Sequence, residues 1–413
     1  MAGHTTRRPE GADRNPALPN RLLPIHPCLD ARTRLGMNGI IPMLNVYSYR
    51  TIDRSDQESI MPKLFSPLKI RDVELKNRIA MSPMCQYSCV DGVVNEWHFI
   101  HLSSRAIGGA ALIMSEATAV TPEGRITPDD AGIWNDAQAG AFKRITDFIS
   151  SAQAVPGIQL AHAGRKASTY TPWKGDGEVT MEKGGWQTLS PSAIRFSEKY
   201  PHPKEMALDD IHRAVEKFRH AAERSLRAGF KLIEIHAAHG YLLHQFLSPI
   251  SNKRTDQYGG DLRGRSRFLL EVVSAIRSTI PDSFPLMVRL SATDWTDGGW
   301  NIDESVELAT MLKQSGVDII DCSSGGNVIV SGIPVAPGYQ VPFAERIKRE
   351  AGIMTGAVGM ITSPEQADQI ITSGQADIVL LARELLRNPY WPLAAAKALR
   401  ADVKWPDQYL RAK

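Results

Sequence analysis

From about residue 78 onward, the sequence repeats one pattern: a short apolar or β-branched run is followed by a longer amphipathic segment that ends at or near a glycine. We expect eight of these runs to be strands: 78–83, 111–117, 157–162, 231–236, 285–291, 318–323, 353–356 and 377–382. The segments between them have helical periodicity, as in 209–228 and 305–314. Eight β-then-α units predict a single α/β domain, a closed parallel TIM (β/α)8 barrel. A doubly wound open sheet is the alternative, but such sheets usually have fewer strands, and the sequence lacks their glycine-rich nucleotide motifs.

Composition excludes several classes of protein. Hydrophobic residues make up 43% and charged residues 23% of the 413 residues, which is typical of a globular chain. The net charge is +3, from 48 basic and 45 acidic residues, and no basic block is interleaved with aromatics, so no nucleic-acid partner is expected. No apolar run reaches the roughly 18 residues of a membrane span, so no membrane partner is expected either.

The cysteines favour a reducing compartment. The four of them, at positions 28, 85, 89 and 322, are too few and too scattered for a disulfide framework in a chain of this length. This pattern fits a cytoplasmic protein. Cys85 and Cys89 lack the second pair of ligands that a structural zinc site needs, so we expect no metal there.

Residues 1–60 differ from the rest of the chain. They contain eight arginines, no lysine and several prolines, without sustained periodicity. We therefore expect a disordered or targeting leader, and the arginine bias is more typical of an organelle transit peptide than of a secretory signal. A flexible tail and a start codon assigned upstream of Met61 are the alternatives. The folded domain is expected to span residues 61–413.

One connection is too long for a simple crossover. Residues 165–208 follow the third predicted strand and contain Trp173, Trp186 and several glycines and prolines, but no clear helix. Because barrel enzymes have their active sites at the ends of the strands, we expect this insertion to cap the pocket.

Small and cationic residues follow the last predicted strands. Gly356, Gly359 and Arg383 come after strands seven and eight, where barrels commonly bind phosphate. Gly325, after strand six, is expected to join the same cradle. Free backbone N–H groups and an arginine fork suit a dianion, although such glycines are also common turn residues.

Gln159 and Arg289 would lie beside the group attached to that phosphate. An amide can pair with the donor and acceptor edges of a flat heterocycle, and a cation can stabilise negative charge on it. The strand ends carry no carboxylate pair and no nucleophile beside a base. Phosphate, amide and cation together predict flavin mononucleotide, FMN.

Two histidines and a tyrosine lie at the end of the fourth predicted strand. Neutral imidazoles at His236 and His239 can both donate N–H to a carbonyl oxygen that gains charge as hydride arrives. Tyr241 is the expected acid for the carbon that remains. A metal site is the alternative. It would need His162 or His244 as a third ligand, and no acidic residue or cysteine joins them at suitable spacing.

Six motifs carry a resemblance to a known family. They are SPMCQY at 82–87, EATAV at 116–120, QLAHAGRK at 159–166, HAAHGY at 236–241, SNKRTDQYGG at 251–260 and RELLR at 383–387. In order and spacing they resemble the old yellow enzyme family of FMN ene-reductases, in the cysteine-containing branch that includes thermophilic-like and xenobiotic reductases. The resemblance covers residues 61–413. The leader has no counterpart in it, and the insertion is longer than in compact members.

The resemblance implies roles for individual residues. It implies catalytic roles for His236, His239 and Tyr241, and substrate contacts by Tyr87, His236 and His239. It also implies that Arg411, in the tail, enters the site of a neighbouring subunit in a homodimer or homotetramer. The implied flavin contacts are Ser82, Pro83, Met84, Cys85, Ala117, Gln159, Arg289, Ser323, Gly325, Gly359, Ala382 and Arg383, with Cys85 tuning the redox potential.

The implied activity is an NADPH dehydrogenase, with NADH as another possible donor, that reduces the C=C bond of α,β-unsaturated carbonyl or nitro compounds. A related barrel flavoprotein that reduces dienoyl-CoA, nitro or nitrate-ester compounds is the first alternative. A flavoprotein that reduces transfer RNA would need a basic face. A non-catalytic flavin carrier would bind FMN without NADPH turnover.

Overall fold

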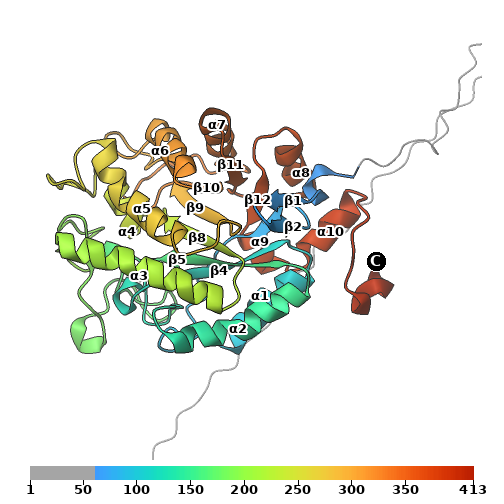
Figure 1. Cartoon of the computed structure of the whole chain (residues 1–413), viewed down its shortest axis with the longest axis horizontal. Coiled ribbons are helices and arrows are strands. Elements are labelled where there is room, and N and C mark those ends of the chain that lie inside the picture. Colours follow the sequence, from blue (N-terminus) through green and yellow to red (C-terminus); the bar gives the residue numbers. More distant parts are fainter. Residues whose placement is uncertain (1–60) are drawn as a thin grey trace, which may run out of the picture. The chain divides into compact units, whose positions relative to one another are not determined.

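The computed structural model describes residues 61–413, so the predicted leader lies outside the described residues. Within that range, eight parallel strands form a closed barrel (Figure 1). They are β3 (Ile79–Met81), β4 (Leu112–Ala119), β5 (Val155–Ala161), β8 (Leu232–Ala237), β9 (Leu286–Ser291), β10 (Ile319–Ser323), β11 (Met354–Ala357) and β12 (Ile378–Leu381). The barrel closes where β12 pairs with β3. Each predicted run overlaps one barrel strand, so the TIM barrel is confirmed and the open-sheet alternative is wrong.

Helices follow the strands and cover the outside of the barrel. They are α1 (Glu96–Ile107), α2 (Asp136–Ser151), α3 (Leu208–Arg227), α4 (Leu242–Leu247), α5 (Leu262–Arg277), α6 (Ile302–Gln314), α7 (Val341–Ala351), α8 (Pro364–Thr372), α9 (Arg383–Arg387) and α10 (Trp391–Ala398). The side chains of Asn95, Asn135 and Asn301 accept hydrogen bonds from first-turn N–H groups and so begin α1, α2 and α6. Gly352, with φ 64°, ends α7 in the left-handed conformation that favours glycine.

Apolar side chains fill the barrel at the end where the strands begin. Leu112, Leu232 and Met287 belong to this inner core, and the hairpin of β1 (Leu68–Ile70) and β2 (Val73–Leu75) packs against it. A strand turns alternate residues to the same face. In β8 and β9, the residues two and four places after Leu232 and Met287 therefore point to the barrel interior, toward the mouth.

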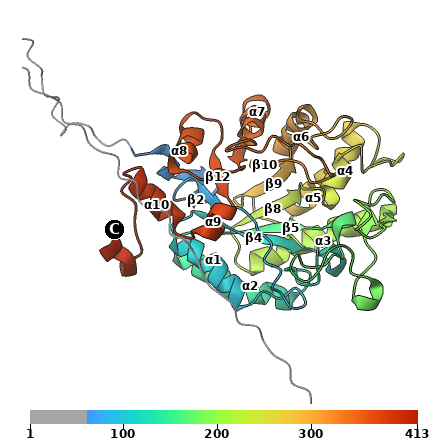
Figure 2. The same cartoon turned by 180° about the vertical axis from the view of Figure 1, so that it is seen from behind.

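The predicted insertion is irregular, as expected. Between β5 and α3 the chain has only short 3-10 turns and the paired two-residue strands β6 (Leu189–Ser190) and β7 (Lys204–Glu205). Both views show these loops, in green, at the opposite end of the barrel from the red C-terminal segment (Figures 1 and 2). Among residues 61–413, none of the helices is both long and apolar enough to cross a membrane.

Candidate active site

The mouth of the barrel contains a cavity of about 320 Å³ where four of the last strands end. Its lining includes seven of the residues predicted to contact the cofactor or substrate: Ser82, His239, Arg289, Ser323, Gly359, Ala382 and Arg383. Tyr339 and Gln340 also line it, and we had not predicted them. Both precede α7, so only their position after the sixth barrel strand could have suggested a role.

Gly359 and Arg383 form the part of this cavity that suits a phosphate. Gly359 has φ 109°, and a Cβ at this position would lie 3.1 Å from Gln340, so a side chain would strain the backbone and crowd the cavity. Arg383, the first residue of α9, is exposed and has its guanidinium available. This position after strands seven and eight is the one that the sequence predicted.

Two glycines do not join this cradle. Gly356 lies within β11, and a Cβ there would come within 2.4 Å of Leu380, so this glycine is required by packing inside the barrel. The N–H of Gly325 donates to the carbonyl of Thr293 at 2.8 Å, and Gly325 is not among the lining residues of the cavity. The sequence prediction placed both glycines near the phosphate from their positions after the strands. Position in the sequence does not show which glycines are needed for packing or which backbone amides already donate hydrogen bonds.

Gln159 and Arg289 face the barrel interior, and Arg289 also lines the cavity. Both are buried, and Arg289 Nη1 donates to Ser82 Oγ at 3.0 Å. Gln159 Nε2 donates to Glu234 Oε1 at 2.7 Å, and Arg289 Nε lies 3.2 Å from Asp321 Oδ2. We predicted no carboxylate pair from the strand ends, and the structure has one in the layer directly below them. The sequence signal for this pair is one acidic residue inside each of two mostly apolar strands, Glu234 in β8 and Asp321 in β10.

The loop after β3 brings Cys85 and Tyr87 to the mouth. Pro83, Met84, Cys85 and Tyr87 are all half-buried. The Cys85 thiol lies within hydrogen-bonding reach of the Ala117 backbone and the Tyr87 hydroxyl, and burial raises its pKa well above the ordinary value. Cys85 is therefore a neutral thiol next to Ala117, another predicted flavin contact.

Glu116 anchors this loop, a role that we had not predicted. Glu116 Oε2 accepts a hydrogen bond from the Gln86 N–H at 2.9 Å, and Glu116 Oε1 lies 3.1 Å from His98 Nε2. Both side chains of the Glu116–His98 pair are 3% exposed, so the anchor is buried. The motif EATAV was visible in the sequence, but the partner on α1 was not.

His236, His239 and Tyr241 come together as predicted. The ring centroids of His236 and His239 are 5.1 Å apart, and those of His236 and Tyr241 are 5.0 Å apart. Burial, and then the charge of Arg289, holds the pKa of both imidazoles well below the ordinary value, so both rings are neutral. Burial likewise raises the pKa of Tyr241, which keeps its proton.

The hydrogen bonds of the two imidazoles differ. The N–H of Ala238 donates to His236 Nδ1 at 3.3 Å, which places the ring proton on Nε2. His239 Nε2 lies 2.7 Å from Ser323 Oγ, so this nitrogen already has a partner. His239 also has φ 57°, which is uncommon for a residue with a side chain.

A second cavity of about 380 Å³ lies beside these rings, under the insertion. Its lining includes Tyr87, Tyr241, Tyr170, Tyr200 and Lys166. The insertion supplies Tyr170 and Tyr200, and its Trp173 packs edge-on against Tyr87 with ring centroids 5.8 Å apart. The insertion therefore covers the pocket, as the sequence predicted.

Lys166 is a candidate functional residue to which the sequence assigned no role. Its Nζ donates to the carbonyls of His239 at 2.9 Å and Gly326 at 3.0 Å, and it lies over the Tyr241 ring at 5.1 Å. Burial and the neighbouring Arg165 lower the pKa of Lys166 to about 8. Lys166 thus fixes the backbone of His239 and places a cation at the wall of the pocket.

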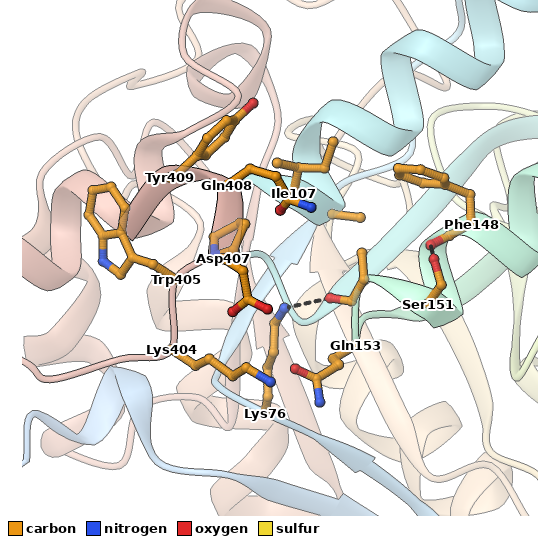
Figure 3. Close-up of a pocket in the computed structure, with 14 residues that line it drawn as sticks. Lys76, Ile107, Phe148, Ser151, Gln153, Lys404, Trp405, Asp407, Gln408 and Tyr409 are labelled. Carbon is orange, nitrogen blue, oxygen red and sulfur yellow. Dashed lines mark hydrogen bonds between the residues drawn. The ribbon is translucent and has the colours of Figure 1, made fainter. Parts of the chain in front are cut away.

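A larger cavity, of about 660 Å³, lies at the other end of the barrel (Figure 3). Residues 404–409 of the tail form one wall, and Lys76 Nζ donates to the Ala152 carbonyl at 3.3 Å. The described residues that line it include no histidine or cysteine, so we assign no chemistry to it. Arg411 follows on the same tail, in η5 (Asp407–Ala412), and is exposed. It lines neither cavity of its own subunit's mouth, and its role at a neighbouring site stays a prediction.

The two other histidines that we considered as metal ligands are used within the fold. His162 Nδ1 accepts a hydrogen bond from the Gly164 N–H at 3.0 Å, and burial lowers its pKa to about 4. His244 Nε2 lies 3.1 Å from Asp294 Oδ1, with both side chains fully buried. Within residues 61–413, no group of three or more His, Cys, Asp or Glu side chains is arranged to hold a metal ion.

Comparison with known proteins gives consistent matches. A model of the NADH:flavin oxidoreductase / NADH oxidase family matches residues 63–402. An NADPH dehydrogenase of Geobacillus thermodenitrificans (strain NG80-2) is 50% identical over 350 residues, which cover 84% of this chain and 98% of the relative. An NADPH dehydrogenase of Bacillus subtilis (strain 168) is 46% identical over 351 residues, covering 84% and 98%.

Solved structures agree with the sequence relatives. Morphinone reductase aligns with a TM-score of 0.70 at 28% identity, covering 85% of this chain and 93% of that one. The old yellow enzyme homologue from Zymomonas mobilis aligns with a TM-score of 0.69 at 28% identity, covering 83% and 94%.

Proposed function

The chain belongs to the NADH:flavin oxidoreductase / NADH oxidase family, that of the old yellow enzymes, and we propose that it is an FMN-dependent, NAD(P)H-driven ene-reductase of the cysteine-containing branch. The proposed substrates are alkenes activated by a carbonyl or nitro group. The observation that carries this proposal is the pair of neutral imidazoles, His236 and His239. His239 lines the first cavity, and His236 packs against Tyr241, which lines the second. The first cavity suits a cofactor phosphate, and the second suits a small organic molecule.

The residues of the first cavity fit FMN. Gly359 leaves room that a side chain would fill, and Arg383 supplies a cation for the phosphate. Buried Gln159 and Arg289 supply amide and cationic groups for the ring, and Arg289 Nε has no well-aligned acceptor of its own. The first expectation is therefore a mononucleotide flavin.

The chemistry that FMN supplies when bound is hydride transfer, from NAD(P)H and onward to the β-carbon of the alkene. His236 and His239 donate N–H to the carbonyl or nitro oxygen, which gains negative charge as the hydride arrives. Because both imidazoles are neutral and buried, this stabilisation does not depend on a protonated histidine. Tyr241 or solvent then gives the α-carbon its proton, so one hydride and one proton add across the C=C bond.

The second cavity selects the substrate. Four tyrosines, at 87, 170, 200 and 241, line it together with Lys166 and Asp176, and the insertion forms part of its wall. We also propose that Arg411 lies at the substrate site of a neighbouring subunit in a homodimer or homotetramer. Its exposure on the tail, outside both cavities of its own mouth, supports this proposal.

The test begins with the purified full chain. It should be yellow and release FMN, not FAD, on denaturation. Anaerobic NADPH should bleach the flavin absorbance, and 2-cyclohexenone should then restore it with one equivalent of cyclohexanone formed. Colourless protein that FMN cannot reconstitute would overturn the proposal.

The choice of oxidant separates the alternatives. Bleached protein that is reoxidised by a nitrate ester, a nitroaromatic or a dienoyl-CoA, but not by the enone, would favour the related reductases. Bound FMN that NADPH does not bleach would indicate a flavin carrier.

A further inference from the structure

A buried carboxyl pair lies below the proposed FMN site. Glu234 on β8 and Asp321 on β10 are both fully buried. They lie two positions after Leu232 and Ile319, which belong to the inner core, so they point inward from alternate strands of the barrel. Side chains from alternate strands share a layer in such barrels. The two carboxyls therefore meet at the centre, and each lies within hydrogen-bonding reach of the other.

The surrounding groups leave a proton unaccounted for. Gln159 Nε2 donates to Glu234 Oε1 at 2.7 Å, and Arg289 Nε forms an ion pair with Asp321 Oδ2 at 3.2 Å. When both acids are treated only as acceptors, Glu234 Oε2 and both oxygens of Asp321 have no hydrogen-bond donor. Leaving buried acceptors unsatisfied is unfavourable, and two facing buried carboxylates would also repel each other. A proton between the two acids removes both problems.

We propose that Glu234 and Asp321 share one proton and act as positioning residues for the cofactor: protonated Glu234 donates to the Asp321 carboxylate, which orients Arg289 and balances its charge beneath the FMN ring. The proposal rests on the function proposed above. It makes the barrel layer below the cavity neutral overall, with one cation and one anion. The flavin potential then depends on the charge at Asp321 and not on that at Glu234.

The acid–base properties of the two groups agree with this geometry. Burial, and then the charge of Asp321, raises the pKa of Glu234 to about 8. Burial also raises the pKa of Asp321, but Arg289 and the hydrogen bond from Glu234 act in the opposite direction. Near neutral pH the proton therefore belongs on Glu234.

Three isosteric variants test the assignment. E234Q keeps an acceptor for Gln159 and a donor for Asp321, and it does not change the net charge of the pair. The FMN affinity should therefore stay within about twofold of wild type, and the midpoint potential within a few millivolts. D321N leaves Arg289 without its counter-charge. It should favour reduced FMN over oxidised FMN by about tenfold, as a buried unit charge nearby does. That ratio corresponds to a rise of about 30 mV for a two-electron couple. D294N, at a buried acid paired with His244 outside the cavity, is the matched control and should leave the potential unchanged.

Infrared spectroscopy provides a readout that does not need the cofactor. The FMN-free protein at pH 7 should show the C=O stretch of a protonated carboxyl that shifts in D2O and is lost in E234Q but not in D294N. Equal potential shifts in E234Q and D321N, no shift in D321N, or no band lost in E234Q would each overturn the shared proton. If wild type binds no FMN, the proposed function fails, while the infrared result still decides the protonation state. If D321N does not fold, D321E, which keeps the charge, should retain the wild-type potential.

Discussion

The sharpest test of the chemistry replaces the two imidazoles one at a time and together. His236 carries its proton on Nε2, because Nδ1 accepts from Ala238, and this N–H has no other acceptor among the hydrogen bonds of the described residues. Removing one such donor typically lowers a rate by about 10²–10³. We therefore expect H236A to slow alkene reduction by about that factor.

H239A should be milder. His239 Nε2 lies 2.7 Å from Ser323 Oγ, so binding a substrate oxygen means giving up that hydrogen bond. Such a bond is worth about 0.5–1.5 kcal/mol net. This difference makes H239A about 2- to 10-fold less harmful than H236A. The double variant should lose at least as much rate as H236A, and several orders of magnitude if the two donors act independently.

Anaerobic stopped-flow measurement separates the two half-reactions. Reoxidation of the reduced flavin by 2-cyclohexenone should show the losses, while reduction by NADPH should fall much less. The double variant H236N/H239N is the matched control, since each amide keeps an N–H donor, and it should recover part of the lost rate. Near-native enone reduction in the double alanine variant with FMN bound would refute the role of these histidines. So would equal losses in both half-reactions.

Three further predictions concern the groups around the imidazoles. C85A should change the midpoint potential of bound FMN and the rate of its reduction by NADPH without unfolding the barrel. The control is C322A, at a buried core residue, which should leave the potential unchanged. An unchanged potential in C85A would mean that Cys85 has only a packing role. R411A should raise the KM for the alkene in the assembled protein and leave NADPH reduction intact, which steady-state kinetics and sedimentation would check; an unchanged KM would argue against a partner site. K166M removes the donor to the His239 carbonyl and should slow enone reoxidation about tenfold, the effect of one or two lost hydrogen bonds. A wild-type rate in stopped-flow would show that Lys166 is not needed to fix the backbone of His239.

The fold followed from the sequence because its signal is local and repeated. Each barrel strand is a mostly apolar run that ends at, or directly before, a polar or small residue, as is typical of buried parallel strands. The first and last residues of individual strands were predicted less accurately. The third strand begins at Val155, two residues before the predicted start, because a proline at position 156 concealed it.

The site was only partly predictable, because hydrogen bonds between distant segments have no local signal. His236 and Tyr241 lie close together in the sequence and meet in the structure. In contrast, Gly325 follows a barrel strand as a cradle residue should, but its amide is bonded to the carbonyl of residue 293. Glu116 and Lys166 belong to motifs that the sequence displayed, yet their roles depend on partners 18 to 160 positions away.

The charges around the mouth explain why neutral histidines occur there. Arg289 and Lys166 both face the imidazoles, and each disfavours a second positive charge beside it. Because the pKa of both rings lies well below its ordinary value, the histidines do not titrate near neutral pH, and their N–H donors persist throughout that range. Lys166, at the wall of the second cavity, does titrate: it loses its proton as the pH rises through about 8. Its neutral amine still has two N–H groups for its two carbonyl partners, so the backbone of His239 stays fixed while the charge at the wall disappears. Because Glu234 also has a pKa of about 8, the profile is measured in E234Q. A fall in enone reoxidation above about pH 8 in that variant would report the charge of Lys166, and a flat profile would show that only its hydrogen bonds matter.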